Sequence, residues 1–248
     1  MKGVLLVTGG GRGIGAATAL LAARQGYAVA VNYRVHSAAA QRVVTAIGDG
    51  GGQAIAVAGD VAVEADVEAM FKAVDQQWGP LTALVNNAGI LTPMARVEAM
   101  DALRLNRIFA INITGSFLCA REAVRRMSTR HGGGGGAIVN VSSAAARLGS
   151  PGEFVDYAAS KGAMDTFTVG LAKEVAAEGI RVNAVRPGLI ATDIHHSSGD
   201  PQRADRLAPQ VPMGRVGSAE EVAQTILWLL SDQASYLTGT LVDISGGR

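Results

Sequence analysis

The chain has 248 residues, 48% of them apolar, which is enough for the core of one α/β domain and little for two. Its 22 basic and 21 acidic residues leave a formal charge of +1, so no general field attracts nucleic acid or an acidic membrane. One cysteine, an amino terminus that turns glycine-rich too early for a signal peptide, and no apolar run of about 18 residues favour a cytoplasmic protein without a membrane span.

Short apolar runs alternate with longer helical patterns along the whole chain. Because each run is continuously apolar, both of its faces should be covered by helices, as in a parallel sheet. The sequence therefore predicts an α/β fold with a doubly wound, seven-stranded parallel sheet, formed as a single domain over residues 1–248. The expected strands are GVLLVT (3–8), YAVAVN (27–32), QAIAVA (53–58), LTALVN (81–86), GAIVNVS (136–142), IRVNAV (180–185) and GTLVDI (239–244).

A glycine-rich turn follows the first strand, in VTGGGRGIGAATALLA (7–22). The start of the helix that it opens offers free backbone N–H groups and a favourable dipole to a pyrophosphate. Gly9, Gly13 and Gly15 spell T-G-x-x-x-G-x-G, a variant of the dinucleotide-binding pattern G-x-G-x-x-G. A P-loop is excluded because no Lys-Ser or Lys-Thr pair follows the glycines.

The end of the second strand lacks the acidic residue that usually binds the ribose of NAD. Asn32, Tyr33 and Arg34 stand there, and Arg12 lies in the glycine turn. Two guanidinium groups near the adenosine ribose suit a 2′-phosphate, so we expect NADP(H) to be preferred over NAD(H).

The middle of the chain carries a helix and a basic stripe. Apolar residues of the segment 64–78 recur at helical spacing and stop at Gly79-Pro80, which predicts an amphipathic helix. The stripe Arg121, Arg125, Arg126 and Arg130 suits a solvated or subunit-facing helix end better than nucleic acid. Cys119 lies among apolar helix positions, so we expect it to be packed in the core, and HGGGGG (131–136) indicates a flexible turn.

Tyr157 and Lys161 lie four residues apart in VDYAASKGAM (155–164), among small side chains. In a helix this spacing puts both on one face. A phenol with a pKa near 10 is a poor catalyst at neutral pH, but a neighbouring cation lowers that pKa by roughly 1–3 units. We therefore expect Lys161 to tune Tyr157, and the small neighbours leave room for a cofactor along the helix.

The carboxyl-terminal part contains a segment with poor apolar periodicity (189–217), which we expect to be a mobile loop. Its adjacent His195 and His196 lack the spacing of zinc ligands, so no metal site is expected. Ser218 and Glu221 have capping-box spacing, which predicts a helix from about 219. No G-x-S-x-G motif supports a serine hydrolase.

Taken together, these motifs resemble the short-chain dehydrogenase/reductase family over the whole chain, and the resemblance implies a Rossmann-type fold and a homotetramer. Within the family the likeness extends to 3-oxoacyl-[acyl-carrier-protein] reductases and glucose dehydrogenases. The stretches occur in the family's order: TGGGRGIG (8–15), GDV (59–61), NNAG (86–89), NITG (112–115), VSS (141–143), YAASK (157–161) and PGLIAT (187–192).

The resemblance implies roles for four catalytic residues. Tyr157 would be the general acid in reduction, Lys161 would lower its pKa and bind the nicotinamide ribose, and Ser143 would orient the substrate oxygen. Asn112 would complete a proton relay through water to Lys161. The spacing from Ser143 to Tyr157 is about one residue longer than is usual, so Ser142 is the alternative to Ser143.

The cofactor site follows from the same motifs. Asp60 and Val61 would bracket the adenine, the segment 86–89 would line the adenosine side, and the segment 187–192 would cradle the nicotinamide and phosphate. The expected cofactor-binding residues are Thr8, Gly9, Arg12, Gly13, Ile14, Gly15, Asn32, Arg34, Asp60, Val61, Asn87, Ala88, Gly89, Tyr157, Lys161, Pro187, Gly188, Ile190 and Thr192.

The leading hypothesis is an NADPH-dependent reductase of a small carbonyl compound, which works reversibly as an alcohol dehydrogenase. A 3-oxoacyl thioester on an acyl carrier protein is one possible substrate, although an acidic carrier needs a basic face beside the site. A sugar is another, because the start of the segment 189–212 is polar. A cofactor-binding scaffold without turnover and a structural oligomer subunit are the non-enzyme alternatives.

Overall fold

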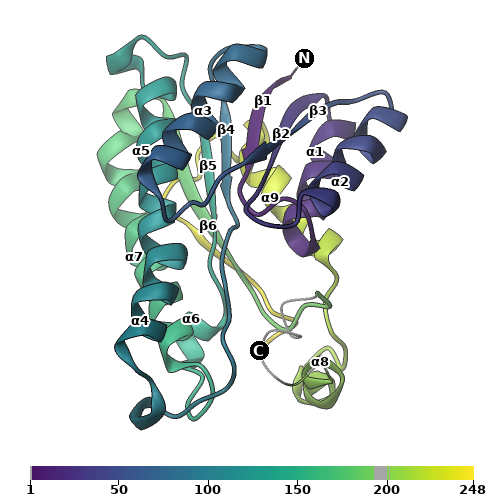
Figure 1. The fold of residues 1–248 in the computed structure, drawn as a ribbon, viewed down its shortest axis with the longest axis vertical. Helices are drawn as coiled ribbons and strands as arrows, with labels where there is room; N and C mark the ends of the chain where they lie inside the picture. Colours follow the sequence, from purple (N-terminus) through teal and green to yellow (C-terminus); the bar gives the residue numbers. More distant parts are fainter. Residues whose placement is uncertain (1, 193–199, 201) are drawn as a thin grey trace.

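The computed structural model describes residues 2–192, 200 and 202–248. All seven expected strands are present, and the fold is the predicted parallel sheet with helices on both faces (Figure 1). The strands run in the order β3-β2-β1-β4-β5-β6-β7, and every neighbouring pair is parallel. Their bounds are β1 Gly3–Val7, β2 Tyr27–Tyr33, β3 Gln53–Ala58, β4 Ala83–Asn86, β5 Gly136–Val141, β6 Ile180–Pro187 and β7 Leu241–Ile244.

The helices between the strands divide into two layers. Helices α1, α2 and α9 pack on one face of the sheet, and α3, α5 and α7 pack on the other. Their bounds, with those of three further helices, are α1 Gly13–Arg24, α2 Ser37–Asp49, α3 Glu64–Trp78, α4 Ala102–Phe109, α5 Gly115–Met127, α6 Ala145–Leu148, α7 Val155–Val175, α8 Arg203–Leu207 and α9 Ala219–Leu230. Within the described residues no helix is both long enough and apolar enough to cross a bilayer.

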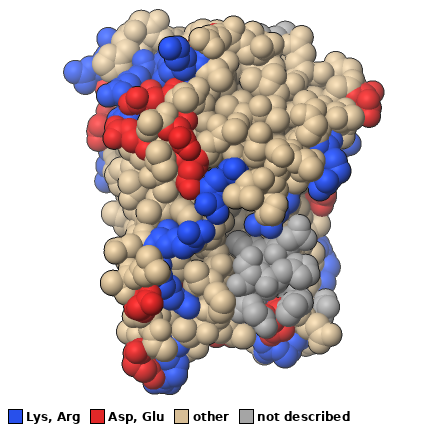
Figure 2. All heavy atoms as spheres, viewed as in Figure 1, with Lys and Arg blue, Asp and Glu red and all other residues tan. Residues whose placement is uncertain are grey.

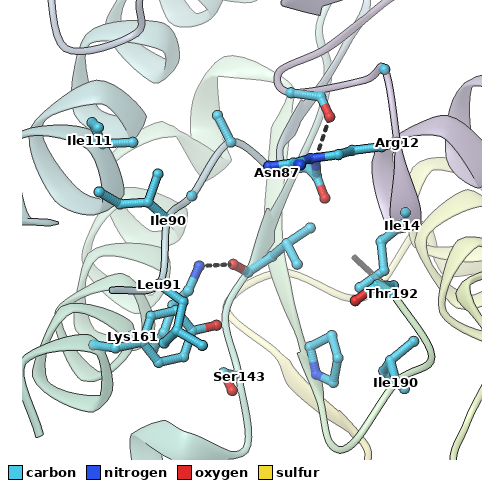
Figure 3. A pocket seen from close by; sticks show the side chains of 18 of the residues that line it. Arg12, Ile14, Asn87, Ile90, Leu91, Ile111, Ser143, Lys161, Ile190 and Thr192 are labelled. Carbon is cyan, nitrogen blue, oxygen red and sulfur yellow. Dashed lines mark hydrogen bonds between the residues drawn. The ribbon is translucent and has the colours of Figure 1, made fainter. Parts of the chain in front are cut away.

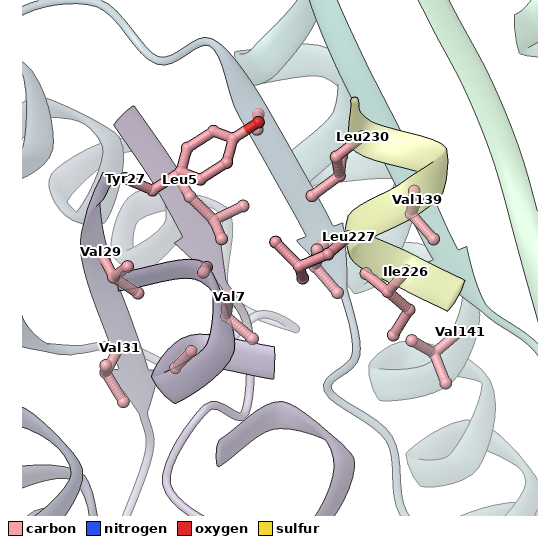
Figure 4. Packing of buried hydrophobic residues seen from close by; sticks show 14 of the residues in the cluster. Leu5, Val7, Tyr27, Val29, Val31, Val139, Val141, Ile226, Leu227 and Leu230 are labelled. Carbon is pink, nitrogen blue, oxygen red and sulfur yellow. The ribbon is translucent and has the colours of Figure 1, made fainter. Parts of the chain in front are cut away.

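The continuous apolar runs of the strands are explained by the two cores. Alternate side chains of one strand enter different cores: Leu5 and Val7 pack with Ile226 and Leu227 of α9, whereas Leu6 packs on the opposite face (Figure 4). Because both faces of each central strand are buried, both sets of alternate positions are mostly apolar.

Local signals fixed several helix ends as predicted. Helix α3 ends at Trp78, and Gly79 follows with a φ of 86°, a conformation that glycine adopts without strain. The capping box at the start of α9 is complete, since Ser218 accepts from the Glu221 backbone and Glu221 accepts from the Ser218 backbone. The glycine run of HGGGGG (131–136) connects the 3₁₀ turn Thr129–His131, which follows α5, to β5.

The prediction that 189–217 is a loop throughout was wrong for its described part. This part contains α8 and a 3₁₀ turn at Ala208–Gln210, and Leu207 and Val211 pack on Leu189. A helix of five residues buries too few side chains to produce a recognisable period. His195 and His196 lie outside the described residues.

The carboxyl ends of the strands all face one edge of the sheet, as the parallel order requires. The order reverses between β1 and β4, which creates a crevice at this edge. The glycine turn after β1, NNAG after β4 and VSS at the end of β5 therefore meet there, although the sequence separates them by more than 50 residues at each step.

Candidate active site

A cavity of about 820 Å³ runs along the carboxyl edge of the sheet (Figure 3). In the figure Lys161 and Ser143 lie on one side, and Arg12, Ile14 and Thr192 lie on the other. The predicted residues that line it are Gly9, Arg12, Gly13, Ile14, Asn32, Arg34, Asp60, Val61, Asn87, Ala88, Gly89, Ser143, Tyr157, Lys161, Pro187, Gly188, Ile190 and Thr192. Thr8, Gly15 and Asn112 do not line it, and each supports a residue that does.

Thr8 and Gly15 shape the glycine turn from behind. The Thr8 hydroxyl accepts the backbone N–H groups of Asn87 and Ala88, both at 2.9 Å, and so joins the β1 and β4 loops. A Cβ at Gly15 would stand 2.6 Å from both the Gly9 carbonyl oxygen and Asn87 Nδ2, so no side chain fits. Gly15 thus provides close packing, the role of one glycine in such turns.

Asn32 lines the cavity, and its side chain also holds the neighbouring loops together. Its side chain is buried, its Oδ1 accepts from Gly9 N at 3.1 Å, and its Nδ2 donates to the Gly59 carbonyl at 3.0 Å. The amide therefore ties β2 to the glycine turn and to the loop after β3. Asn86, expected to line the adenosine side, is also buried and donates to Asn140 and to the Ser116 carbonyl instead of lining the cavity.

The end of the cavity beside β2 is basic. Arg12 and Arg34 line it as predicted, and Arg42 of α2 joins them. The Arg34 guanidinium lies 3.5 Å from the Asp60 carboxylate, and its side chain remains 46% exposed, so it can still bind an anion. Arg42 was not predicted. It lies three residues after Ala39 and four after Ala38, which also line the cavity, so helical spacing puts the three side chains on one face of α2.

Tyr157 and Lys161 face the cavity from the first two turns of α7. Lys161 is buried and its Nζ donates to the Val141 carbonyl at 2.7 Å, while Nζ lies 5.6 Å from the centre of the Tyr157 ring. The Ser143 side chain accepts the Ala145 backbone N–H at 3.1 Å and lies near enough to the Tyr157 hydroxyl to lower its pKa. Ser142 is buried and donates to the Lys161 backbone carbonyl at 3.1 Å, which fixes α7 against β5.

The pKa of the Tyr157 hydroxyl is raised, opposite in direction to the sequence prediction. Crowding by protein atoms disfavours the charged phenolate and outweighs the Ser143 hydrogen bond, which lowers the pKa. Burial also lowers the pKa of Lys161 from 10.5 to about 8, and the Asp165 carboxylate opposes this change. The phenol is therefore firmly protonated at neutral pH, the state that a general acid requires.

Asn112 lies in a π-helical turn, Ala110–Thr114, between α4 and α5. Its Oδ1 accepts from Ile90 N at 2.8 Å, and its Nδ2 donates to the Ile90 carbonyl and to Ser160 Oγ. A Cβ at Gly89 would lie 3.5 Å from Asn112 Oδ1 and 3.6 Å from Lys161 Nζ. The missing side chain of Gly89 thus leaves a polar space between the two groups.

The ends of β6 and β7 close the other side of the cavity. A Cβ at Gly188 would meet the Ser245 backbone at 2.7 Å, so only glycine permits this approach of the loops after β6 and β7. A Cβ at Gly13 would stand 3.3 Å from the Thr192 methyl group. The glycine turn and the segment after β6 therefore face each other closely across the cavity.

The far end of the cavity, beside Tyr157, is mostly apolar and was not predicted. Leu91, Leu148, Phe154 and Leu189 line it, and Arg203 stacks over the Phe154 ring while it pairs with Glu153. These residues come from separate helices and loops. The sequence carried no pattern that unites them, because their proximity depends on the fold.

The basic stripe on α5 is neutralised by acidic neighbours. Arg126 pairs with Asp75 and Glu122, and Arg121 pairs with Glu64. Acidic and basic atoms are accordingly intermixed at the upper left of the molecular surface (Figure 2).

Cys119 of the same helix is buried, and burial raises the pKa of its thiol to about 12, as expected for a residue packed in the core.

A dinucleotide crevice with a tyrosine, a lysine and a serine at one end defines an oxidoreductase of the short-chain type. The chain belongs to the short-chain dehydrogenase/reductase family. The family model described as enoyl-(acyl carrier protein) reductase matches residues 9–248. The chain is 60% identical over 245 residues to the uncharacterized oxidoreductase YgfF of Escherichia coli, with 99% of both chains covered.

Two further relatives have more specific descriptions. A 3-oxoacyl-[acyl-carrier-protein] reductase of Synechocystis is 40% identical over 247 residues, with 98% of this chain and 96% of the relative covered. The solved 3-ketoacyl-(acyl-carrier-protein) reductase of Brucella melitensis, complexed with NADH, has a TM-score of 0.92 and 34% identity, with 99% and 98% covered.

Proposed function

We propose that the chain is an NADP(H)-dependent reductase of small carbonyl compounds, with Tyr157 as the general acid. The observation that carries this proposal is that Ser143, Tyr157 and Lys161 line the same cavity, with Lys161 Nζ buried 5.6 Å from the centre of the Tyr157 ring. We further propose that the chain acts as one catalytic domain over 1–248, as a homotetramer in the cytoplasm.

The residues present fit a nicotinamide dinucleotide. Glycines at positions 9, 13 and 15 let the backbone of the turn after β1 approach a ligand closely, and the cavity continues from there to Tyr157. Arg12, Arg34 and Arg42 would hold the 2′-phosphate of NADP(H), because guanidinium groups bind phosphate with paired hydrogen bonds. When bound, the nicotinamide supplies or accepts the hydride.

The chain's own residues would supply and move the proton. Tyr157 donates its hydroxyl proton to the carbonyl oxygen as negative charge develops there, and Ser143 orients that oxygen. The Lys161 ammonium stabilises the resulting tyrosinate. Water in the space at Gly89, between Asn112 and Lys161, would return a proton to the site.

The apolar end of the cavity favours substrates with an aliphatic part over sugars. Leu91, Leu148 and Phe154 offer few hydrogen bonds to a polyol. A 3-oxoacyl thioester is the second candidate, supported by the description of the Synechocystis relative. The paired arginines of α5 offer little free positive charge to an acidic carrier protein, so we favour a small ketone.

The first test is NADPH oxidation with a panel of aliphatic ketones, 3-oxoacyl thioesters and sugar-derived carbonyls. We expect turnover of at least one ketone or thioester, and a loss of at least about 100-fold in kcat in Tyr157→Phe, which should still bind NADPH. A fully active Tyr157→Phe enzyme would exclude Tyr157 as the acid. Tight NADPH binding without turnover on the panel would favour the scaffold alternative.

The cofactor preference has its own test in Arg34→Ala. The substitution removes a charge-assisted contact and leaves the Asp60 carboxylate free to repel a phosphate. We expect the ratio of kcat/KM for NADPH to that for NADH to fall about 10-fold or more. Arg96→Ala, at an exposed arginine outside the cavity, is the control and should leave the ratio unchanged. An unchanged ratio in both variants would remove Arg34 from phosphate recognition.

A further inference from the structure

A buried carboxylate lies one helical turn beyond Lys161. Asp165 follows Lys161 by four residues, as Lys161 follows Tyr157, so the three side chains share one face of α7. Asp165 is 8% exposed and Lys161 is 4% exposed. The catalytic roles proposed above make no use of Asp165.

The two carboxylate oxygens of Asp165 differ in their contacts. Nε and Nη2 of Arg186 both contact Oδ2, at 2.9 and 2.8 Å, and Oδ1 is buried without a hydrogen-bond partner among the described residues. A well-formed structural pair would use both oxygens, one for each donor. An unpaired buried carboxylate oxygen is costly, so its retention calls for a reason other than stability.

Lys161 explains why a carboxylate is buried here, because the other groups around Lys161 do not compensate its positive charge. The groups facing it from β5 and the π-helical turn are uncharged, namely the Val141 carbonyl and the Asn112 amide. Tyr157 is the titratable neighbour on its own helix. Asp165 favours the charged form of Lys161 through space, and Arg186 of β6, with Asp243 of β7 beyond it at 3.9 Å, stands behind Asp165.

Arg186 also connects Asp165 to the cofactor side of the cavity. It precedes Pro187 and Gly188, which line the cavity at the end of β6. The pair therefore holds the helix that carries Tyr157 and Lys161 against the strand that leads to this wall. A change at Asp165 would alter both the charge behind Lys161 and this spacing.

We propose that Asp165 is a positioning residue of the reaction, whose carboxylate keeps Lys161 cationic and, through Arg186, fixes α7 relative to the end of β6. The inference rests on the proposed function, since it concerns the lysine that supports Tyr157. Asp165 touches neither substrate nor cofactor in this role.

The test is the pH dependence of kcat/KM for carbonyl reduction. With the pKa of Lys161 at about 8 and that of Tyr157 raised, the wild-type enzyme should lose activity as the pH rises through about 8, where Lys161 loses its proton. Removing the negative charge in Asp165→Asn lowers the pKa of Lys161 further. The fall in activity should therefore move to lower pH by on the order of one unit.

Two variants separate this role from a structural one. Asp165→Glu keeps the charge and should keep the wild-type pH profile even if kcat falls. Asp75→Asn removes a carboxylate that pairs with Arg126 outside the cavity, and should change the melting temperature but not the profile. If Asp165→Asn lowers stability with an unchanged profile, the proposal is wrong. Should that variant not fold, Asp165→Ser removes the charge with less bulk and is judged by the same criterion.

A measurement without turnover distinguishes this inference from the proposed function. The titration of Lys161 is followed by NMR of protein labelled with ¹³C at the lysine ε-carbon, with Lys161→Arg used for assignment. If the apparent pKa of Lys161 is lower in Asp165→Asn than in wild type, the role of Asp165 is supported even when no carbonyl is reduced. A lower pKa without any carbonyl reduction would count against the proposed reaction but not against the role of Asp165. Equal pKa values overturn the role of Asp165.

Discussion

Two adjacent serines line the cavity, and the partners of their hydroxyl groups favour Ser143 as the residue that orients the substrate. Ser143 reaches the Tyr157 side chain, whereas the buried Ser142 donates to the Lys161 carbonyl. We expect Ser143→Ala to reduce kcat about 100-fold with little change in melting temperature, because it removes a donor to the developing negative charge. Ser142→Ala should mainly lower the melting temperature. Steady-state kinetics and thermal unfolding measure both effects, and inactivation by Ser142→Ala alone would reverse the assignment.

At the same scale, the sequence could indicate which residues gather at the site but not what their side chains bind. The motifs brought Tyr157, Lys161 and Ser143 together as expected. Asn86 was assigned to the cavity by its position, yet it does not line the cavity, and its amide donates to Asn140 and to the Ser116 carbonyl inside the fold. The raised pKa of Tyr157 was missed for a similar reason, since it follows from atoms packed around the ring and not from the spacing to Lys161.

At the scale of elements, one buried ion pair joins α4 to α7, the helix on which Tyr157 and Lys161 lie. Arg104 of α4 binds both oxygens of Asp156 in α7, at 2.7 and 3.3 Å, and also donates to the Pro93 carbonyl. The Asp156 side chain is fully buried. Arg104→Ala leaves this charge without its partner, so we expect a loss of about 3–5 kcal/mol in the free energy of unfolding.

Urea denaturation measures this loss, and Arg96→Ala is the matched control. Arg96 pairs with Glu98, but both side chains are largely exposed, so its removal should cost less than about 1 kcal/mol. Similar losses in the two variants would show that burial does not increase the contribution of the Arg104–Asp156 pair to stability.

Whether an element could be predicted depended on its length and its burial. The central strands have both faces covered, and α3 has both a clear period and a glycine stop, so local sequence determined them. Helices α6 and α8 have four and five residues. The π-helical turn at Asn112 was also not predicted, because an extra residue in a helical turn produces no distinct apolar pattern.

At the scale of the molecule, α4 and α5 follow each other end to end with α7 beside them (Figure 1), and this face of the molecule carries exposed apolar side chains. Phe117 of α5 is 47% exposed and its ring stacks on Phe167 of α7 with centroids 3.8 Å apart, and Leu103 of α4 is 78% exposed. Exposed apolar side chains of this size are typical of subunit interfaces. They support the proposed homotetramer, with this face covered by a second copy of the chain.

Light scattering after size exclusion tests the assembly. We expect wild type to have the mass of four 25.4 kDa chains, and Phe117→Glu to form smaller species, because a carboxylate cannot be buried between apolar faces without a large penalty. Val63→Glu, at a valine of similar exposure (45%) on the amino end of α3, should leave the mass unchanged. A stable wild-type monomer at micromolar concentration would contradict the tetramer. If Phe117→Glu dissociates and keeps full activity, the cavity, which one chain lines by itself, is complete without the other subunits.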